Sequence, residues 1–84
     1  MKFCVITFRS VTPAQRGEAL LKRAGLECSI QRTPRWMEEQ GCGYSLRLRC
    51  RDVLGAAELL RGKGIPFRKV YLSQDDGKLV EMYP

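Results

Sequence analysis

The chain has 84 residues, of which 44% are hydrophobic, and its 15 lysines and arginines against 9 aspartates and glutamates give a formal net charge of +6. This length fits a single domain, residues 1–84, and excludes a second one. No apolar segment approaches the ~20 residues of a transmembrane helix, and no secretory signal follows Met1, so we expect a cytoplasmic protein with no membrane partner. The basic residues are scattered, which disfavours a nucleic-acid-binding arm.

The first half of the chain is predicted to form a strand, a helix and a second strand. Apolar, β-forming residues at 2–8 predict a buried strand. Thr12 is expected as the N-cap of the helix, with Pro13 at its first position, and Gly25 as the residue that ends it. Residues 26–32 alternate between apolar and polar side chains, which predicts the second strand.

The second half is predicted to repeat this order. Residues 44–50 alternate strictly and form the clearest strand pattern in the sequence. Asp52 is expected as the N-cap of a second helix, which ends at Gly64. A fourth strand is then expected over residues 65–72, and an additional short strand over residues 78–83.

A weak internal repeat supports this two-fold organisation. Residues 19–26 resemble residues 58–65, because each stretch holds the end of a helix, a glycine and an aliphatic residue that enters a strand. The chain therefore reads as two βαβ halves. Right-handed crossovers predict an α+β, ferredoxin-like βαββαβ fold: a four-stranded antiparallel sheet with two helices on one face and an extra C-terminal strand.

The face of this sheet away from the helices is predicted to carry both apolar and basic side chains. The first and third strands are neighbours in the centre of such a fold. Their outward positions are then Phe3, Val5, Ser45, Arg47 and Arg49. An apolar stripe beside two arginines indicates either a partner surface or a face covered by the last hairpin, and the sequence leaves both open.

Cys42 is the candidate functional residue. It stands between Gly41 and Gly43, so no bulky neighbour shields it and the backbone can turn sharply. A thiol reacts only as the thiolate, which needs exposure and nearby positive charge. Arg35 and Arg47 are the candidates to supply that charge. The alternative is that Cys42 is an ordinary loop residue with no functional role.

The other cysteines, Cys4, Cys28 and Cys50, fall on inward strand positions. Free cysteine is among the most buried residue types, so we expect these three to be reduced thiols that pack in the core. The sequence has no histidine and no closely spaced cysteine pair, so a metal site is disfavoured and no cofactor is expected.

The order of these features resembles the selenium/sulfur (Se/S) carrier protein-like family of small bacterial and archaeal proteins. The resemblance covers about residues 2–71, and its specific parts are Pro34-Arg35 and Cys42-Gly43. It implies a non-enzymatic carrier that holds sulfur or selenium on Cys42 as a persulfide or selenosulfide, between unidentified donor and acceptor proteins. It further implies that Gly43 is the loop partner of Cys42, and that Pro34 and Arg35 give conformational and electrostatic support.

Residues 36–40 depart from the family pattern. They are bulky and acidic, and the charges of Glu38 and Glu39 would raise the pKa of a nearby thiol.

The alternative hypothesis is a non-enzymatic binding or regulatory module. Such a module would use the open sheet face, with Arg47 and Arg49, for a protein, a second copy of the chain or nucleic acid. Nucleic acid is the least favoured of these, because an RNA-binding sheet of this fold presents aromatic side chains where this one has Ser and Arg.

Overall fold

The computed structural model describes residues 3–32, 43–73 and 79–82. These residues form one five-stranded sheet in the order β2-β3-β1-β4-β5, in which every neighbouring pair is antiparallel. The elements are β1 (Phe3–Phe8), α1 (Val11–Arg23), β2 (Cys28–Arg32), β3 (Tyr44–Arg49), α2 (Cys50–Gly62), β4 (Val70–Ser73) and β5 (Leu79–Met82). The ferredoxin-like order is confirmed, and β5 adds the extra C-terminal strand.

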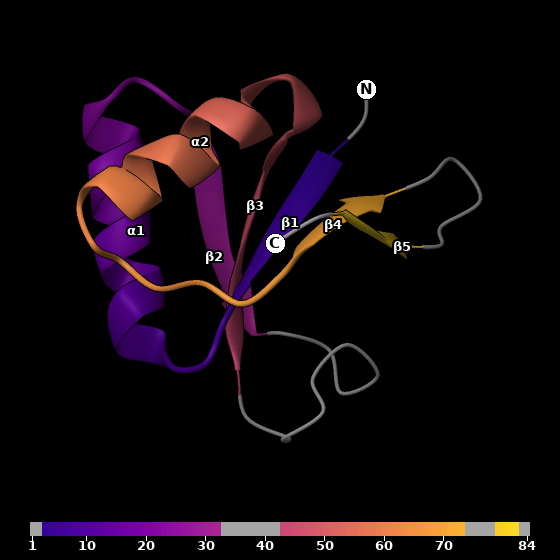
Figure 1. Cartoon of the computed structure of the whole chain (residues 1–84), viewed down its shortest axis with the longest axis horizontal. Coiled ribbons are helices and arrows are strands. Elements are labelled where there is room, and N and C mark those ends of the chain that lie inside the picture. The colour runs from indigo at the N-terminus through magenta and orange to yellow at the C-terminus, as the bar shows by residue number, and fades with distance from the viewer. Residues whose placement is uncertain (1–2, 33–42, 74–78, 83–84) are drawn as a thin grey trace.

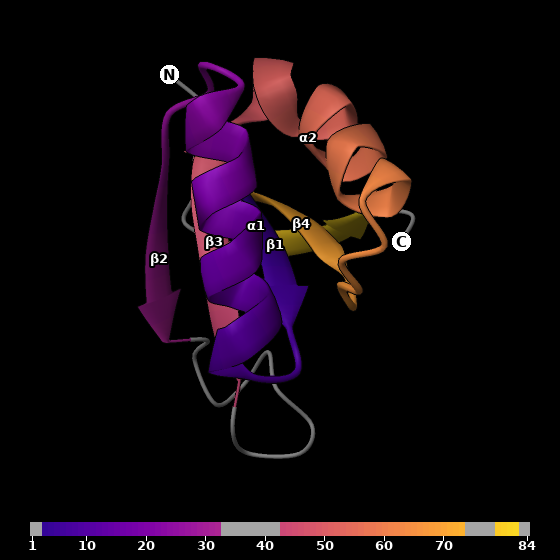
Figure 2. The same cartoon turned by 90° about the vertical axis from the view of Figure 1, so that its left-hand side faces the viewer.

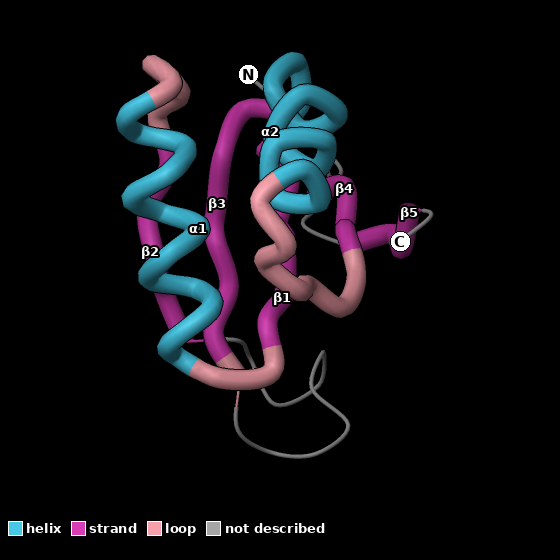
Figure 3. The backbone as a smooth tube through the Cα atoms, turned by 60° about the vertical axis from the view of Figure 1, so that its left-hand side comes forward, coloured by secondary structure: helices cyan, strands magenta, loops and turns pink. Residues whose placement is uncertain are grey.

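Both helices cover the same face of the sheet (Figures 1 and 2). The helix α1 packs on β2, β3 and β1, while α2 packs on β3 and β1. The tube view shows the two helices side by side over the central strands, with β4 and β5 beyond α2 (Figure 3). The right-handed βαβ crossovers predicted for this fold account for that placement.

The core lies between the helices and the two central strands. Its largest fully buried side chains come from β1, α1, β3 and α2: Ile6, Phe8, Leu21, Leu46, Leu48 and Leu60. The alternation in residues 44–49 therefore predicts the inward face of β3 correctly.

The strand β1 is buried on both faces. Cys4, Ile6 and Phe8 join the core cluster under the helices. On the other face Val5 is 5% exposed and Thr7 is 3% exposed, so these residues are covered as well. The Thr7 hydroxyl accepts a hydrogen bond from the Lys69 backbone N–H at 3.0 Å, just before β4 begins. This bond satisfies the buried hydroxyl of Thr7.

Both helices end in the same hydrogen-bonded motif. Gly25 (φ 88°) and Gly64 (φ 68°) adopt the left-handed conformation that glycine accepts without steric cost. The N–H of Leu26 bonds the carbonyl of Leu21 at 2.9 Å, and the N–H of Ile65 bonds that of Leu60 at 2.9 Å. These bonds satisfy helix-end carbonyls in Schellman geometry and confirm the internal repeat.

The predicted helix starts were wrong. Ser10 and Arg49 occupy the N-cap positions, and neither side chain caps its helix within the described residues. Pro13 is the third residue of α1, where its missing N–H costs nothing because the first four N–H groups of a helix have no partner inside it. Asp52 lies in the first turn of α2, where its carboxylate favours the positive helix end.

Gly17 sets how closely α1 approaches the core. A Cβ atom at this position would lie 3.1 Å from Leu60 Cδ2 and 3.3 Å from Leu46 Cδ1. Both distances are shorter than ordinary van der Waals contact, and both neighbours are fully buried. Any side chain here therefore has to displace α1 or repack the core.

We predict that Gly17→Val lowers the free energy of unfolding by about 1–3 kcal/mol through overpacking. Gly55→Val is the matched control, since Gly55 is also inside a helix but a Cβ there meets nothing within 4 Å. Urea unfolding followed by circular dichroism measures both variants. Equal stability for Gly17→Val and Gly55→Val would contradict the close approach of α1.

Candidate functional site

Most of the predicted site lies outside the described residues. This holds for Cys42 and for its predicted supports Pro34, Arg35 and Gly41. The structure does place Gly43, which is buried directly before β3, and it places Arg47 within that strand. The described surroundings of Gly43 are therefore the part of the site that can be built from its geometry.

Gly43 directly precedes β3, which lies between β1 and β2 in the sheet. The next residue, Tyr44, is the register partner of Phe8 on β1 and of Arg32 on β2. The Arg32 guanidinium carbon lies 5.9 Å from the centroid of the Tyr44 ring, within the range of a cation–π contact. A positive charge thus lies beside the residue that follows Gly43.

Several chain segments meet at this end of the sheet, which we call the Gly43 end. Here β1 and β2 finish, β3 and β4 begin, and α1 starts (Figure 1). The antiparallel pairing extends to the connection before β4, where the N–H of Arg68 bonds the carbonyl of Thr7 at 2.7 Å. Residues 7–13, 30–32, 43–46 and 67–70 make up the described part of this end.

The Gly43 end is cationic. Its described segments contain four basic residues, Arg9, Arg32, Arg68 and Lys69. One carboxylate reaches these segments from α1, where Glu18 Oε2 accepts a hydrogen bond from the Ile30 N–H at 3.3 Å. The N-terminus of the 13-residue helix α1 adds the positive end of a helix dipole, and the first turn of α1 holds no acidic residue. Such a concentration of positive charge favours anions, a thiolate or a persulfide included.

Ser45 lies on the predicted face of β3, opposite to the core residues Leu46 and Leu48, but it is not exposed there. It was expected on the open sheet face beside Arg47, but it is fully buried, and its Oγ has no hydrogen-bond partner among the described residues. Its register partners are Thr7 on β1 and Gln31 on β2. Arg47, on the same face of β3, is exposed, so alternation gives the face of these residues but not their burial.

Arg47 is not brought to the Gly43 end. Its guanidinium carbon stacks 4.0 Å from the centroid of the Phe3 ring, at the start of β1 and on the half of β3 remote from Gly43. Four residues of strand separate Arg47 from Gly43, a span of about 13 Å. The basic residue that lies beside Tyr44 is Arg32, which the sequence reasoning missed because the pairing of β2 with β3 has to be known first.

The open sheet face offers little of the predicted partner surface. Val5 is buried, and the Arg49 Nη2 lies 3.4 Å from Glu27 Oε2 in an ion pair. Arg47 covers one face of the Phe3 ring. Val5 and both arginines therefore have contacts within the chain, while Arg47 also stays exposed on this face.

The expectation of three separate core thiols was wrong for two of them. Cys4 and Cys50 form a disulfide, with their Cα atoms 4.9 Å apart. Cys50 was expected at the end of a strand, whereas it is the first residue of α2, and this places it over the start of β1. Cys28 is the free cysteine of the described chain.

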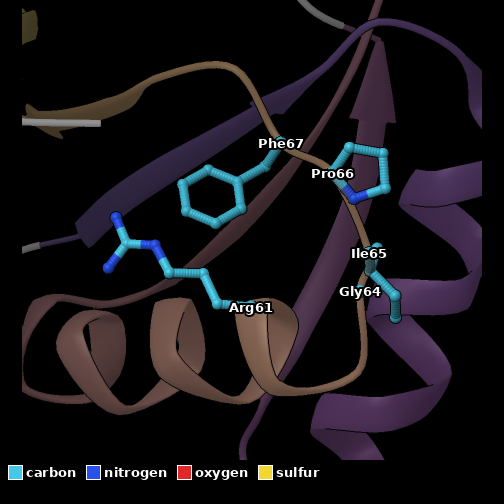
Figure 4. A pocket seen from close by; sticks show the side chains of 5 residues that line it. All are labelled: Arg61, Gly64, Ile65, Pro66 and Phe67. Atoms are coloured by element: carbon cyan, nitrogen blue, oxygen red, sulfur yellow. The ribbon is translucent and has the colours of Figure 1, made fainter.

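A shallow hollow lies between the end of α2 and the connection to β4. Its lining residues are Arg61, Gly64, Ile65, Pro66 and Phe67 (Figure 4). The Arg61 side chain runs alongside Phe67, with its guanidinium carbon 5.4 Å from the ring centroid. The described residues that line this hollow include no thiol and no carboxylate.

The comparisons with known proteins assign the family. The model of the family described as "Putative Se/S carrier protein-like" matches residues 3–72. The chain belongs to this family. A comparison with curated proteins and one with solved structures found no match.

Two further findings concern the parts of this Se/S carrier-like chain that the structure describes. None of the described helices has the length and apolar character needed to cross a membrane. Residues 3–32, 43–73 and 79–82 also hold no cluster of three histidine, cysteine, aspartate or glutamate side chains suited to a metal ion.

Cys28 is a poor nucleophile in this structure. Burial raises the pKa of its thiol, the Glu18 carboxylate raises this pKa further, and Lys22 lowers it by a smaller amount. The thiol also donates a weak hydrogen bond to the Glu18 carbonyl oxygen at 3.9 Å. Cys28 is therefore held in its neutral form over the physiological pH range.

We predict that Cys28 is alkylated more slowly than a free thiol at pH 8, because its raised pKa leaves less thiolate at that pH. Glu18→Gln removes one cause of the shift and should speed the reaction by about threefold or more. Glu58→Gln, an exposed change on α2, is the control. Site-resolved mass spectrometry measures the rates, and an unchanged rate in Glu18→Gln would show that Glu18 does not act on Cys28.

Proposed function

We propose that this protein carries sulfur or selenium on Cys42, as a persulfide or selenosulfide, and delivers it to an acceptor protein. The observation that carries the proposal is membership of the Se/S carrier-like family over residues 3–72, a range that includes Cys42 and Gly43. The protein acts as a carrier rather than as an enzyme, since the cargo enters and leaves on the same thiol.

The charge at the Gly43 end supports this chemistry. The Cys42 thiolate attacks the terminal sulfur of a donor persulfide, the donor S–S bond breaks, and the donor cysteine leaves as a thiolate. The product is a persulfide on Cys42, which is an anion at neutral pH. The α1 N-terminus and the basic residues around Gly43, Arg32 among them, favour both the attacking thiolate and this anion.

Within this proposal the supporting residues keep distinct roles. Gly41 and Gly43 leave the thiol accessible, Pro34 restricts the backbone, and Arg35 adds positive charge. Arg47 takes no part in this proposal, because its guanidinium stacks on Phe3. A cytoplasmic location belongs to the same proposal, since a reducing compartment keeps the carrier thiol available.

We predict that Cys42→Ser abolishes the transfer of labelled sulfur from a desulfurase-type donor. The serine hydroxyl cannot form a persulfide, so at least about tenfold less label should be bound than in the unsubstituted protein. Cys28→Ser is the matched control and should load normally, because Cys28 is held neutral. The readout is the mass gain of one sulfur atom on the peptide that contains residue 42.

The opposite pattern would overturn the carrier proposal. If Cys42→Ser still accepts labelled sulfur, the cargo is held elsewhere on the chain. If Cys28→Ser loses loading while Cys42→Ser keeps it, the carrier thiol is Cys28.

A further inference from the structure

The disulfide Cys4–Cys50 lies at the opposite end of the sheet from Gly43. Gly43 directly precedes β3, and Cys50 directly follows it as the first residue of α2. Seven residue steps along β3 separate the two positions by about 23 Å. Whatever chemistry these cysteines perform is therefore spatially separate from the Gly43 end.

The geometry excludes a bridge between Cys4 and Cys28. Leu48 is the register partner of both Cys4 on β1 and Cys28 on β2, so the two cysteines flank it on strands two positions apart. Two strand spacings put their Cα atoms about 10 Å apart, beyond the ~7 Å that a disulfide can span. Cys28 therefore cannot replace Cys50 as the partner of Cys4.

The two sulfurs of the disulfide differ in access. Cys4 is fully buried within the core cluster, whereas Cys50 is only partly buried and packs against the outside of that cluster. A thiolate that approaches from solvent meets the Cys50 sulfur first. Access decides which sulfur of a disulfide is attacked, so Cys50 is the exchange position.

The start of α2 favours a thiolate at Cys50. A cysteine at a helix N-terminus faces backbone N–H groups that lack partners inside the helix, and the N-cap residue Arg49 supplies no capping side chain among the described residues. The charged residues next to Cys50 in the chain are Arg49 and Arg51. Arg49 forms an ion pair with Glu27, and Arg51 Nε lies 3.9 Å from Asp52 Oδ1. Positive and negative side chains are balanced here, so the helix end itself provides the net stabilisation.

The fold can also hold Cys4 and Cys50 as two reduced thiols. Cys4 belongs to the buried apolar cluster, and Cys50 packs on it as a partly buried apolar side chain. Free cysteine behaves as a small hydrophobe, so opening the bridge leaves this packing in place. The fold thus offers a site for both redox states.

We infer that Cys4 and Cys50 form a redox-active pair that undergoes thiol–disulfide exchange with an external dithiol, with Cys50 as the exchange sulfur and Cys4 as the resolving sulfur. This function is additional to the proposed carriage of sulfur on Cys42. Cytosolic disulfides in most organisms are transient and catalytic or redox-sensing, in keeping with such a pair in the location proposed above.

The exchange balances in two steps. A thiolate of the dithiol attacks the Cys50 sulfur, the Cys4–Cys50 bond breaks, and Cys4 leaves as a thiolate that takes up a proton. The second thiolate of the dithiol then attacks its own partner sulfur in the mixed disulfide, and Cys50 leaves as a thiolate. The dithiol ends as a disulfide, and two electrons have passed to the protein.

The first test is reduction of the oxidised, native protein by dithiothreitol, followed by site-resolved alkylation. We expect Cys50 to become alkylated while circular dichroism still reports the folded state, and the buried Cys4 to be recovered as a thiol when the protein is unfolded afterwards. A bridge that dithiothreitol opens only in the presence of denaturant is structural, and that result would overturn the inference.

The second test compares the two thiols singly. In Cys4→Ser the remaining Cys50 thiol should form a mixed disulfide with dithionitrobenzoate about tenfold faster than Cys28, the factor by which one unit of pKa changes the thiolate fraction. In Cys50→Ser the buried Cys4 should react no faster than Cys28. Equal rates for Cys50 and Cys28 would contradict the inference. If either variant fails to fold, the reduction test alone decides whether the pair is redox-active.

Both tests are repeated in a Cys42→Ser background. The exchange pair should behave identically there, because Gly43 and Cys50 lie at opposite ends of β3. Failure of the exchange pair is thereby distinguished from failure of the carrier proposal, which is read from sulfur loading alone.

Discussion

The pairing of β1 with β3 is the constraint on which the rest of the structure depends. The register runs without interruption from Phe3↔Arg49 to Phe8↔Tyr44, so the two strands are aligned over their whole lengths. This alignment buries the core side chains of both strands under the helices. It also puts the start of β3 beside the end of β1, and the end of β3 beside the start of β1.

The two ends of this ladder have different chemistry. At the Gly43 end the α1 N-terminus and several basic residues gather, and the Glu18 carboxylate of α1 bonds the Ile30 N–H there. At the other end Cys50 leads into α2 and is bridged to Cys4. Each end combines a helix N-terminus with sulfur chemistry, proposed for Cys42 at the first and observed as a disulfide at the second. One ladder thus separates the two proposed thiol functions within a chain of 84 residues.

The features that could be predicted from the sequence are those that local residues determine. Gly25 and Gly64 end the helices because their left-handed backbone needs glycine. The alternation around Leu46 and Leu48 gives the inward face of β3, and the repeat gives the strand order. The ferredoxin-like arrangement follows from these local signals and from the handedness of βαβ units.

The features that could not be predicted depend on contacts between distant residues. The disulfide requires the register of β1 and β3, together with a helix that begins at Cys50 without a connecting loop. The position of Arg32 beside Tyr44 requires knowledge of which strands flank β3. Thr12 and Asp52 satisfied the preferences for an N-cap, yet the helices start earlier, because such preferences are worth only about 1 kcal/mol and packing overrides them.

The central claim is that the cationic Gly43 end tunes a reactive thiolate at Cys42. It is tested most directly by the pH dependence of alkylation at Cys42, resolved by mass spectrometry on native protein with the Cys4–Cys50 bridge intact. The account predicts half-maximal reactivity well below the ~8.5 of a free cysteine, with a shift toward that value as salt screens the positive charge. A Cys42 that titrates like a free thiol, or above it, would contradict the account.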